Sequence, residues 1–309
     1  MFSADQYELL DFGDGRRLER FGAIVLDRPC PTAEPLAKAD PAAWSRTDAR
    51  FDRIDAERGT WTLRGELPPR WTIRHDRLVL EMKRTDFGHV GLFAEQAENW
   101  DWLIAGNGSI FRPIDVTDGH DVVRKHGPAP LPPPRPRVLN LFAYTGGSTL
   151  AAAAAGAEVT HVDAARNIVA WARRNAELSG MADSPIRWIA EDAMKFVKRE
   201  LRRGNRYDAV VLDPPSYGHG THGEVWRLSK HLPHLLRLCA ELTESGPQFM
   251  LLTCHTPGFG PGRLAEMVTE SLGPGGVTAR EMTLRTAAGR ELPSGCMVRW
   301  EPNTMDMGK

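Results

Sequence analysis

The sequence predicts an α/β fold in which a doubly wound sheet of mostly parallel strands follows a small β-rich domain. From residue 137 onward, short apolar runs alternate regularly with helical patterns, which is typical of βα units in a parallel sheet. The first 90 residues instead alternate apolar and polar side chains between turn signals. That pattern indicates half-buried antiparallel strands.

The β-rich part is predicted to hold short strands joined by turns. Alternation such as Leu78, Leu80 and Met82 places one face of a strand in a core. Asp14 and Gly15 mark the first turn. The predicted strands are Gln6–Phe12, Leu18–Leu26, Arg50–Asp55, Thr60–Leu63, Trp71–His75 and Leu78–Lys83.

Two segments lead into the larger part. Apolar residues at helical spacing predict a helix over residues 93–104. Residues 127–137 hold six prolines in eleven positions, so we expect a stiff extended connector there. We therefore predict a β-rich module at 1–88, for which substrate recognition is the expected role, and a second domain at 89–309 that contains the connector.

The larger part is predicted to contain seven strands with helices between them. The last strand is expected to run antiparallel to the others. The strands are Val138–Phe142, Glu158–Val162, Ile186–Ile189, Ala209–Leu212, Phe249–Thr253, Thr278–Leu284 and Cys296–Trp300. The helices are expected at about 148–156, 166–179, 192–203, 222–244 and 262–272.

Composition narrows the class of protein. A chain of 309 residues can bury a full core without disulfides, and its four cysteines form no CxxC pair, so neither a disulfide framework nor a structural zinc site is indicated. No window approaches the roughly 18 apolar residues of a membrane span, and Asp5 and Glu8 argue against a cleaved signal. We expect a cytoplasmic protein. A net charge of −1 does not by itself point to nucleic acid.

The chemistry is expected at the carboxyl ends of the parallel strands, where such sheets bind ligands. The first strand runs into a glycine turn at Asn140–Ser148 that opens a helix and offers free N–H groups to a ligand. The dinucleotide fingerprint GxGxxG is missing, because the turn has only Gly146 and Gly147. This weakens a hydride-transfer enzyme as an interpretation.

Acidic residues end the next three strands. Asp163 ends the second strand, where a carboxylate can accept two hydrogen bonds from a ribose diol, and Asp192 follows the third. Either could instead cap the helix that comes next. Asp213 ends the fourth strand and precedes Pro214 and Pro215, which fix the turn and remove two N–H donors, so the carboxylate and the proline carbonyls should face the crevice.

Together these strand ends resemble the class I S-adenosylmethionine-dependent methyltransferases, in particular the group of large-subunit rRNA cytosine-5 methyltransferases. Val138–Gly147 is similar to that group's first motif, and Val162–Ala164 with Trp171–Leu178 to its second. Asp208–Tyr217 resembles its DPPSF segment. The resemblance covers about residues 80 to 300 and implies a Rossmann-like, seven-stranded methyltransferase domain that acts on RNA, as in rRNA processing.

The resemblance also implies roles for individual residues around S-adenosylmethionine. The glycine turn would surround the methionine moiety, Asp163 would hold the ribose, and Asp192 with Ala193 would meet the adenine. The implied cofactor residues are Asn140, Phe142, Tyr144, Thr145, Gly146, Gly147, Asp163, Ala164, Asp192, Ala193 and Gln96. The implied catalytic residues, at the junction of cofactor and substrate, are Asp213, Pro214, Pro215 and Tyr217.

The chain departs from that group at three points. Gln96 matches a glutamine of the FFLDQR segment, but Ala97 stands where the family has an arginine, and the first 80 residues do not resemble the family's RNA-binding PUA module. Thr256 falls where the family has its nucleophilic cysteine, whereas Cys254 lies two residues earlier, a shift of about 6 to 7 Å along a strand. Cys254 and His255 should point to opposite faces, so Cys254 is expected to be an ordinary buried residue.

Other interpretations stay open at this point. We expect in-line methyl transfer to a nucleophile held by the Asp213 turn, either an exocyclic amine whose hydrogens Asp213 and the Pro214 carbonyl accept, or a pyrimidine carbon if Cys254 can reach it. The alternatives are an RNA-binding or nucleoside-binding protein without turnover and a nucleotide-dependent oxidoreductase. We expect no zinc among His219, His222, His231 and His234. The basic run between Lys195 and Arg206 is expected to be a solvated helix face.

Overall fold

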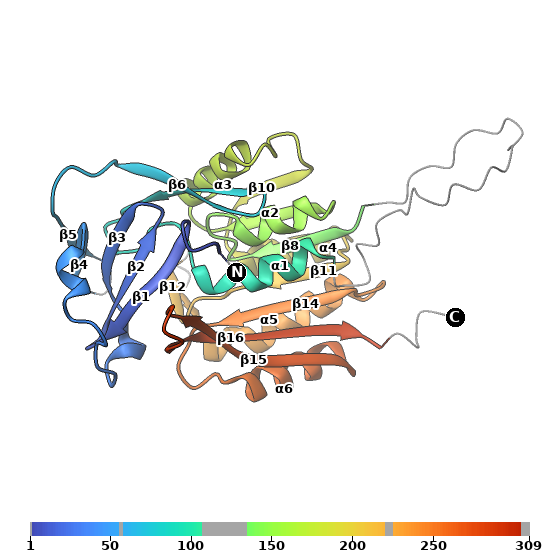
Figure 1. Cartoon of the computed structure of the whole chain (residues 1–309). Coiled ribbons are helices and arrows are strands. Elements are labelled where there is room, and N and C mark those ends of the chain that lie inside the picture. Colours follow the sequence, from blue (N-terminus) through green and yellow to red (C-terminus); the bar gives the residue numbers. More distant parts are fainter. Residues whose placement is uncertain (1, 56–57, 107–134, 220–224, 304–309) are drawn as a thin grey trace, which may run out of the picture.

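The computed structural model confirms the predicted α/β fold. Figure 1 shows an N-terminal sheet beside a larger sheet flanked by helices. The N-terminal sheet has five strands and the larger one seven. Most of the proline-rich connector predicted at 127–137 lies outside the described residues. Those residues are 2–55, 58–106, 135–219 and 225–303 of the 309.

The five-stranded sheet keeps its strands in sequence order. They are β1 (Tyr7–Gly13), β2 (Arg16–Phe21), β3 (Ile24–Pro29), β4 (Ala49–Arg53) and β5 (Gly59–Leu63). The prediction of one strand over Leu18–Leu26 is wrong, because Gly22 has a φ of 61° and turns the chain back between β2 and β3. Strands β3 and β4 pair in parallel, unlike the antiparallel pairing expected here.

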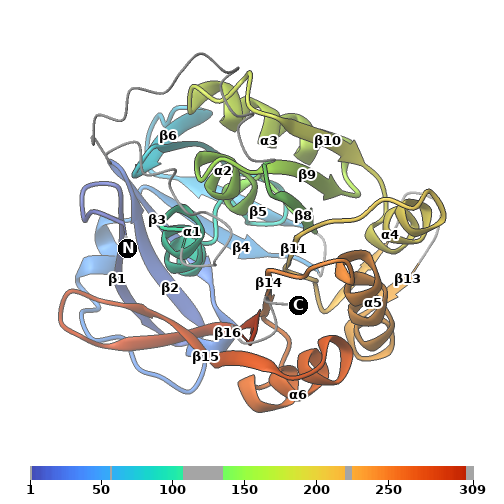
Figure 2. The ribbon, with the colours of Figure 1, turned by 90° about the vertical axis from the view of Figure 1, so that its right-hand side faces the viewer.

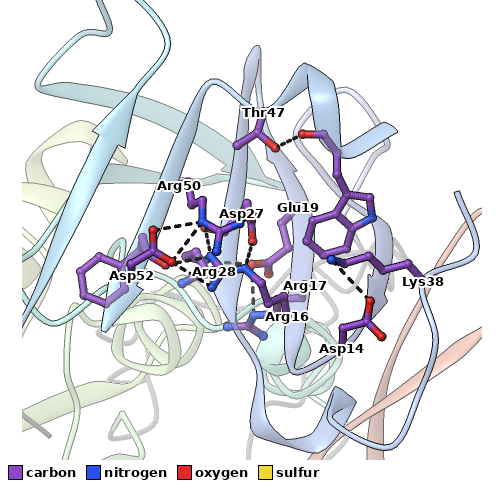
Figure 3. Close-up of polar contacts among 12 residues, drawn as sticks. Asp14, Arg16, Arg17, Glu19, Asp27, Arg28, Lys38, Thr47, Arg50 and Asp52 are labelled. Carbon is purple, nitrogen blue, oxygen red and sulfur yellow. Dashed lines mark hydrogen bonds and ion pairs between the residues drawn. The ribbon is translucent and has the colours of Figure 1, made fainter. Parts of the chain in front are cut away.

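A network of arginines and carboxylates crosses this sheet (Figure 3). Arg16 donates to Asp27 at 2.5 Å and also contacts Asp52 at 3.3 Å. The buried Glu19 accepts a bond of 3.0 Å from the buried Arg28. Burying an unpaired charge costs free energy of folding, so these ion pairs make the burial of charged side chains in the sheet possible.

A hairpin of β6 (Arg70–His75) and β7 (Leu78–Lys83) connects the N-terminal sheet to the larger part. It packs on α3 (Arg166–Leu178): the backbone N–H of Glu81 donates to Asn175 Oδ1 at 2.8 Å, and Trp171 Nε1 donates to the carbonyl of Glu81 at 3.0 Å. The hairpin therefore contacts the large domain although it precedes residue 88. The division of the chain at that residue stays a prediction.

The large sheet has the order β10-β9-β8-β11-β14-β16-β15. Neighbouring strands from β10 to β14 pair in parallel, and β16 runs antiparallel to both of its neighbours, as predicted for the last strand. The strands are β8 (Arg137–Leu141), β9 (Glu158–Asp163), β10 (Ile186–Ala190), β11 (Ala209–Leu212), β14 (Phe249–Cys254), β15 (Gly275–Arg285) and β16 (Glu291–Pro302).

Successive residues of the parallel strands enter different cores, since side chains alternate between the faces of a sheet. Val211 and Leu251 join a core shared with α1, α2 and the N-terminal sheet. Val210 and Leu252 join the core beneath α4, α5 and α6. Figure 2 shows these two helix groups on either side of the sheet. The bounds are α1 (Ala97–Ile104), α2 (Gly147–Ala154), α4 (Ala193–Arg202), α5 (Leu228–Thr243) and α6 (Pro261–Leu272).

Two predicted helices are shorter than expected. The helix predicted over 222–244 begins only at Leu228, because Val225–Arg227 forms strand β13 and pairs with β12 (Tyr217–His219). The helix predicted from residue 93 begins at Ala97, after a single 3-10 turn over Ala94–Gln96. In the ranges that the structure covers, no helix is long and apolar enough to span a membrane.

Candidate cofactor and substrate site

A cavity of about 500 Å³ lies at the carboxyl ends of strands β8, β9, β10 and β11. A smaller cavity of about 50 Å³ adjoins it beside the glycine turn. Nine of the predicted site residues line the larger cavity: Phe142, Tyr144, Asp163, Ala164, Asp192, Ala193, Asp213, Pro214 and Pro215. Five more line the smaller one: Gln96, Asn140, Thr145, Gly146 and Gly147.

The turn after β8 has an unusual backbone. Phe142 and Tyr144 have φ angles of 55° and 48°, a left-handed conformation that is uncommon for residues with a Cβ atom. Gly146 continues it with a φ of 89°, and a Cβ on Gly147 would lie 2.2 Å from the ring of Trp100. Such strain is typical of ligand-binding loops, and the N-terminus of α2 at Gly146 and Gly147 lines the smaller cavity.

Buried polar side chains next to this turn are connected by hydrogen bonds. Asn140 donates to Thr149 Oγ1 at 2.8 Å, and the Thr149 hydroxyl lies 2.9 Å from His161 Nδ1. Because Thr149 accepts from Asn140, its own proton is available for His161. Burial lowers the pKa of His161 to about 3, so the ring is neutral at pH 7. His161 has a structural role that the sequence analysis missed.

Asp163 fixes the glycine turn to the second strand. Its Oδ2 accepts from the backbone N–H of Tyr144 at 2.9 Å, and its Oδ1 accepts from that of Ala165 at 3.0 Å. Burial raises the pKa of this carboxyl above its usual range. Each oxygen keeps a further lone pair, so the carboxylate can also accept hydrogen bonds from a ligand in the cavity.

The acid after β10 serves as a helix cap. Asp192 accepts from the backbone N–H of Lys195 at 2.9 Å, which caps α4, the alternative left open for this residue. It lines the cavity as well, so capping and ligand contact are compatible. The adjoining Glu191 also lines the cavity and forms an ion pair with Arg199.

The Asp213 turn closes the cavity on its other side. Asp213 Oδ2 accepts from Gln96 Nε2 at 3.2 Å, while Oδ1 is buried and has no hydrogen-bond partner among the described residues. The carbonyl of Pro215 accepts from Trp226 Nε1 at 2.7 Å. Tyr217, the remaining residue of this predicted group, lies on β12 with 51% of its surface exposed and does not line either cavity.

Cys254 ends β14 and His255 follows it, and the two side chains have different surroundings, as expected for adjacent residues at a strand end. Cys254 is 1% exposed and belongs to the core beneath α4 to α6. Burial raises the pKa of its thiol, and its sulfur accepts from the backbone N–H of Thr256 at 3.5 Å. His255 lines the larger cavity.

Several cavity residues were absent from the sequence-based set: His89, Phe93, Glu191, Trp226 and His255. His89 and Phe93 lie in the segment that resembles FFLDQR, so that segment was the available signal. Burial, followed by the charges of Arg28, Arg17 and Arg53, lowers the pKa of His89 to about 4. Arg28 of the N-terminal sheet also donates to the carbonyl of Gly88, the residue before His89, at 3.3 Å.

Comparison with known proteins shows the family of this chain. The S-adenosylmethionine-dependent methyltransferase family matches residues 128–274. A solved SAM-dependent methyltransferase from Agrobacterium tumefaciens is 36% identical, with a TM-score of 0.83 over 96% of this chain and 91% of that one. The chain belongs to the S-adenosylmethionine-dependent methyltransferases. S-adenosylmethionine is its cofactor.

Curated relatives carry more specific names. Ribosomal RNA large subunit methyltransferase I of Aeromonas hydrophila is 34% identical over 122 residues, which cover 37% of this chain and 31% of that protein. Ribosomal RNA large subunit methyltransferase K/L of Allochromatium vinosum is 41% identical over 91 residues, or 28% of this chain and 12% of that protein. The matches thus span less than a third of these relatives' length.

The residues present fit this cofactor. Asp213 Oδ1 and Tyr144 Oη are buried polar atoms without a hydrogen-bond partner among the described residues, and both belong to residues that line the larger cavity. Phe142 and Trp226, whose ring centroids are 5.0 Å apart, give the same cavity an aromatic wall suited to a nucleobase. No group of three His, Cys, Asp or Glu side chains within the described ranges could hold a metal ion.

Proposed function

We propose that this methyltransferase modifies a base of RNA, with ribosomal RNA as the substrate. The observation that carries the proposal is the Asp213-Pro214-Pro215 turn, which lines the cavity and in which Asp213 Oδ1 is buried without a hydrogen-bond partner among the described residues. The names of the curated relatives support the substrate class. A ribosomal substrate also implies work in the cytoplasm.

We assign the cavity residues as follows. Asn140–Gly147 holds the methionine end, Asp163 the ribose, and Asp192 with Ala193 the adenine. Bound there, S-adenosylmethionine supplies an already activated methyl group. The chain's own residues then orient the acceptor: Asp213 and the Pro214 carbonyl accept its hydrogens, and the walls exclude water.

Transfer to carbon 5 of a pyrimidine has weaker support. That reaction needs a thiolate bonded to carbon 6. Cys254 is buried in the core, and burial favours its protonated form. We therefore keep this chemistry as an outcome of the test below. The family assignment replaces the alternative of a nucleotide-dependent oxidoreductase.

We propose that the N-terminal module, residues 1–88, selects the substrate. Arg28 of this module donates to the carbonyl of Gly88, next to His89 in the cavity wall, at 3.3 Å, and Arg53 at the end of β4 is exposed, so it can meet an RNA phosphate. Arg53→Glu should lower kcat/KM for RNA at least tenfold and leave cofactor affinity unchanged. Arg77→Glu, an exposed charge in the β6–β7 turn, is the matched control.

The test of the function uses RNA from cells that lack the protein. Purified full-length protein is incubated with this RNA and methyl-labelled S-adenosylmethionine, and the nucleosides are then separated by mass spectrometry. We expect one labelled nucleoside that is missing from RNA of the deletion cells and present in RNA of the parent cells. The same reaction is run with the RNA-free fraction of an extract from these cells. Label that enters only this fraction, and not the RNA, would refute the proposal.

A further inference from the structure

His255 lies between two carboxylates at the edge of the cavity. Its Nε2 is 3.6 Å from Asp213 Oδ1, and its Nδ1 is 3.8 Å from Glu95 Oε1. The ring of Phe93 lies beside it, with centroids 6.1 Å apart and an interplanar angle of 35°. These contacts come from two strand ends and the 3-10 turn before α1, so several elements fix the ring at one place.

The backbone leaves room for this ring at Gly295. That residue lies on β16 with a φ of 97°, and a Cβ there would come within 2.7 Å of His255 Nδ1 and 2.8 Å of the Cys254 carbonyl. A side chain at this position would therefore displace the imidazole.

A carboxylate faces each of the two ring nitrogens of His255. Glu95 Oε2 and Asp213 Oδ1 are both buried without a hydrogen-bond partner in the described part of the chain. The Glu95 side chain is 5% exposed and that of Asp213 is 30% exposed, so water screens these charges only in part. A carboxylate that holds an imidazole and stabilises its protonated form is an established way to make histidine a base.

His255 is open to the cavity, which is the other requirement of a base. Its side chain is 35% exposed, and the ring lines the same cavity as Asp163 and Pro214. Cys254, by contrast, has its sulfur in the core. The side chain of this pair that faces the cavity is thus an imidazole and not a thiol.

We propose that His255 is a catalytic base and that the methyl acceptor is a nitrogen or oxygen atom bearing hydrogen. This inference rests on the proposed function in one respect, namely that the methyl acceptor binds in the cavity. The acceptor's lone pair forms the bond to the methyl carbon, and the bond from sulfur to that carbon breaks with its electrons left on sulfur. The electrons of the acceptor's X–H bond stay on the acceptor, and the proton moves to His255 Nε2, then to water. Glu95 is a positioning residue.

The experiment compares full-length wild type, His255→Ala, His255→Gln, Glu95→Gln and a control, His234→Ala, whose histidine is exposed on α5. The acceptors are the RNA fraction and the RNA-free fraction of an extract from cells that lack the protein. Readouts are kcat and KM for the labelled fraction, calorimetric affinity for S-adenosylhomocysteine, thermal melting, and the methylated atom from mass spectrometry.

We expect both His255 variants to lose at least about a hundredfold in kcat, the range typical of a general base, with product affinity within threefold of wild type. Added imidazole should restore activity to His255→Ala but not to Glu95→Gln. His234→Ala should stay within twofold. Label in the RNA-free fraction alone would refute the RNA substrate. The role of His255 would then be tested with the substrate in that fraction.

Three results would overturn the proposal. The first is a kcat of His255→Ala within tenfold of wild type. The second is a loss of activity that parallels a loss of affinity for S-adenosylhomocysteine, which would make His255 a binding residue. The third is a 5-methylpyrimidine product, which would mean that the acceptor is carbon.

Discussion

Gln96 donates from one amide nitrogen to both Asp213 Oδ2, at 3.2 Å, and Thr253 Oγ1, at 3.1 Å. Asn99 donates to Gln96 Oε1 at 2.9 Å and accepts from Arg299 at 2.8 Å, so the amide can turn only its nitrogen toward Asp213. The glutamine that the family motif singled out therefore fixes the carboxylate at the proposed acceptor site.

Replacing Gln96 should disturb that carboxylate. Gln96→Glu places a second carboxylate against Asp213, and like charges at this distance repel. We expect kcat/KM for methyl transfer to fall at least tenfold, about 1.4 kcal/mol, with a smaller loss for Gln96→Ala. Thermal melting of both variants checks the fold. Equal activity of Gln96→Glu and wild type would contradict this role.

Asp163→Ala should weaken cofactor binding. The change removes the proposed acceptors of the ribose hydroxyls and also those of the N–H groups of Tyr144 and Ala165, the first of which belongs to the glycine turn. We expect a loss of about 2 to 4 kcal/mol in calorimetric affinity for S-adenosylmethionine. Asp163→Asn keeps one acceptor oxygen and should lose less. An affinity of Asp163→Ala within threefold of wild type would rule out the ribose assignment.

The positions of the strands were predictable because parallel strands are buried on both faces and read as apolar runs. Ala209–Leu212 has the same bounds in the prediction and in the structure. The turn at Gly22 was missed because the apolar residues on its two sides read as one continuous strand. The β12–β13 pair was missed because it is too short for a periodic pattern.

The site was predictable only where it follows the strand ends. Asp163, Asp192 and Asp213 each end or follow a strand, so topology alone brings them to one cavity. His255 was considered only with its neighbour Cys254. Its partner Glu95 lies 160 positions earlier in the chain, and no local pattern connects the two. Such contacts depend on how α1 and β14 pack, which a sequence pattern does not encode.

His161 should make the fold sensitive to acid. Its pKa is about 3 in the folded state and near 6.5 when unfolded, so between these values the unfolded chain binds the extra proton and stability falls as pH falls. At pH 4.5 the loss from this residue should be about 2 to 3 kcal/mol. Urea unfolding at pH 7 and 4.5 measures it. His161→Gln should show a smaller difference between the two pH values, and an unchanged difference would refute the assignment.

Asp213 and Cys254 should differ sharply in their effect on turnover. Asp213→Ala removes a carboxylate at the acceptor site, and we expect at least a hundredfold loss in kcat/KM, about 2.7 kcal/mol. Cys254→Ala changes a buried thiol outside the cavity and should keep at least a tenth of wild-type activity. Loss of all activity in Cys254→Ala, with covalent trapping of wild type by RNA containing 5-fluorocytidine, would instead identify a pyrimidine carbon-5 enzyme.

Alanine substitutions of two glycines, one between β15 and β16 and one on β16, distinguish the effect of backbone strain from the effect of displacing His255. Gly289 has a φ of 82°, and no atom of the described residues lies within 4 Å of the position that a Cβ would take. Gly295 has a φ of 97°, and a Cβ there would lie 2.7 Å from His255 Nδ1. Alanine at either position adopts an unfavourable left-handed conformation, which should cost about 1 to 2 kcal/mol of unfolding free energy, and Gly295→Ala should lose more because its Cβ would also lie 2.8 Å from the Cys254 carbonyl. Only Gly295→Ala moves the proposed base, so only it should lose methyl transfer, by at least tenfold in kcat. Equal activities of the two variants would show that the position of the ring does not matter for catalysis.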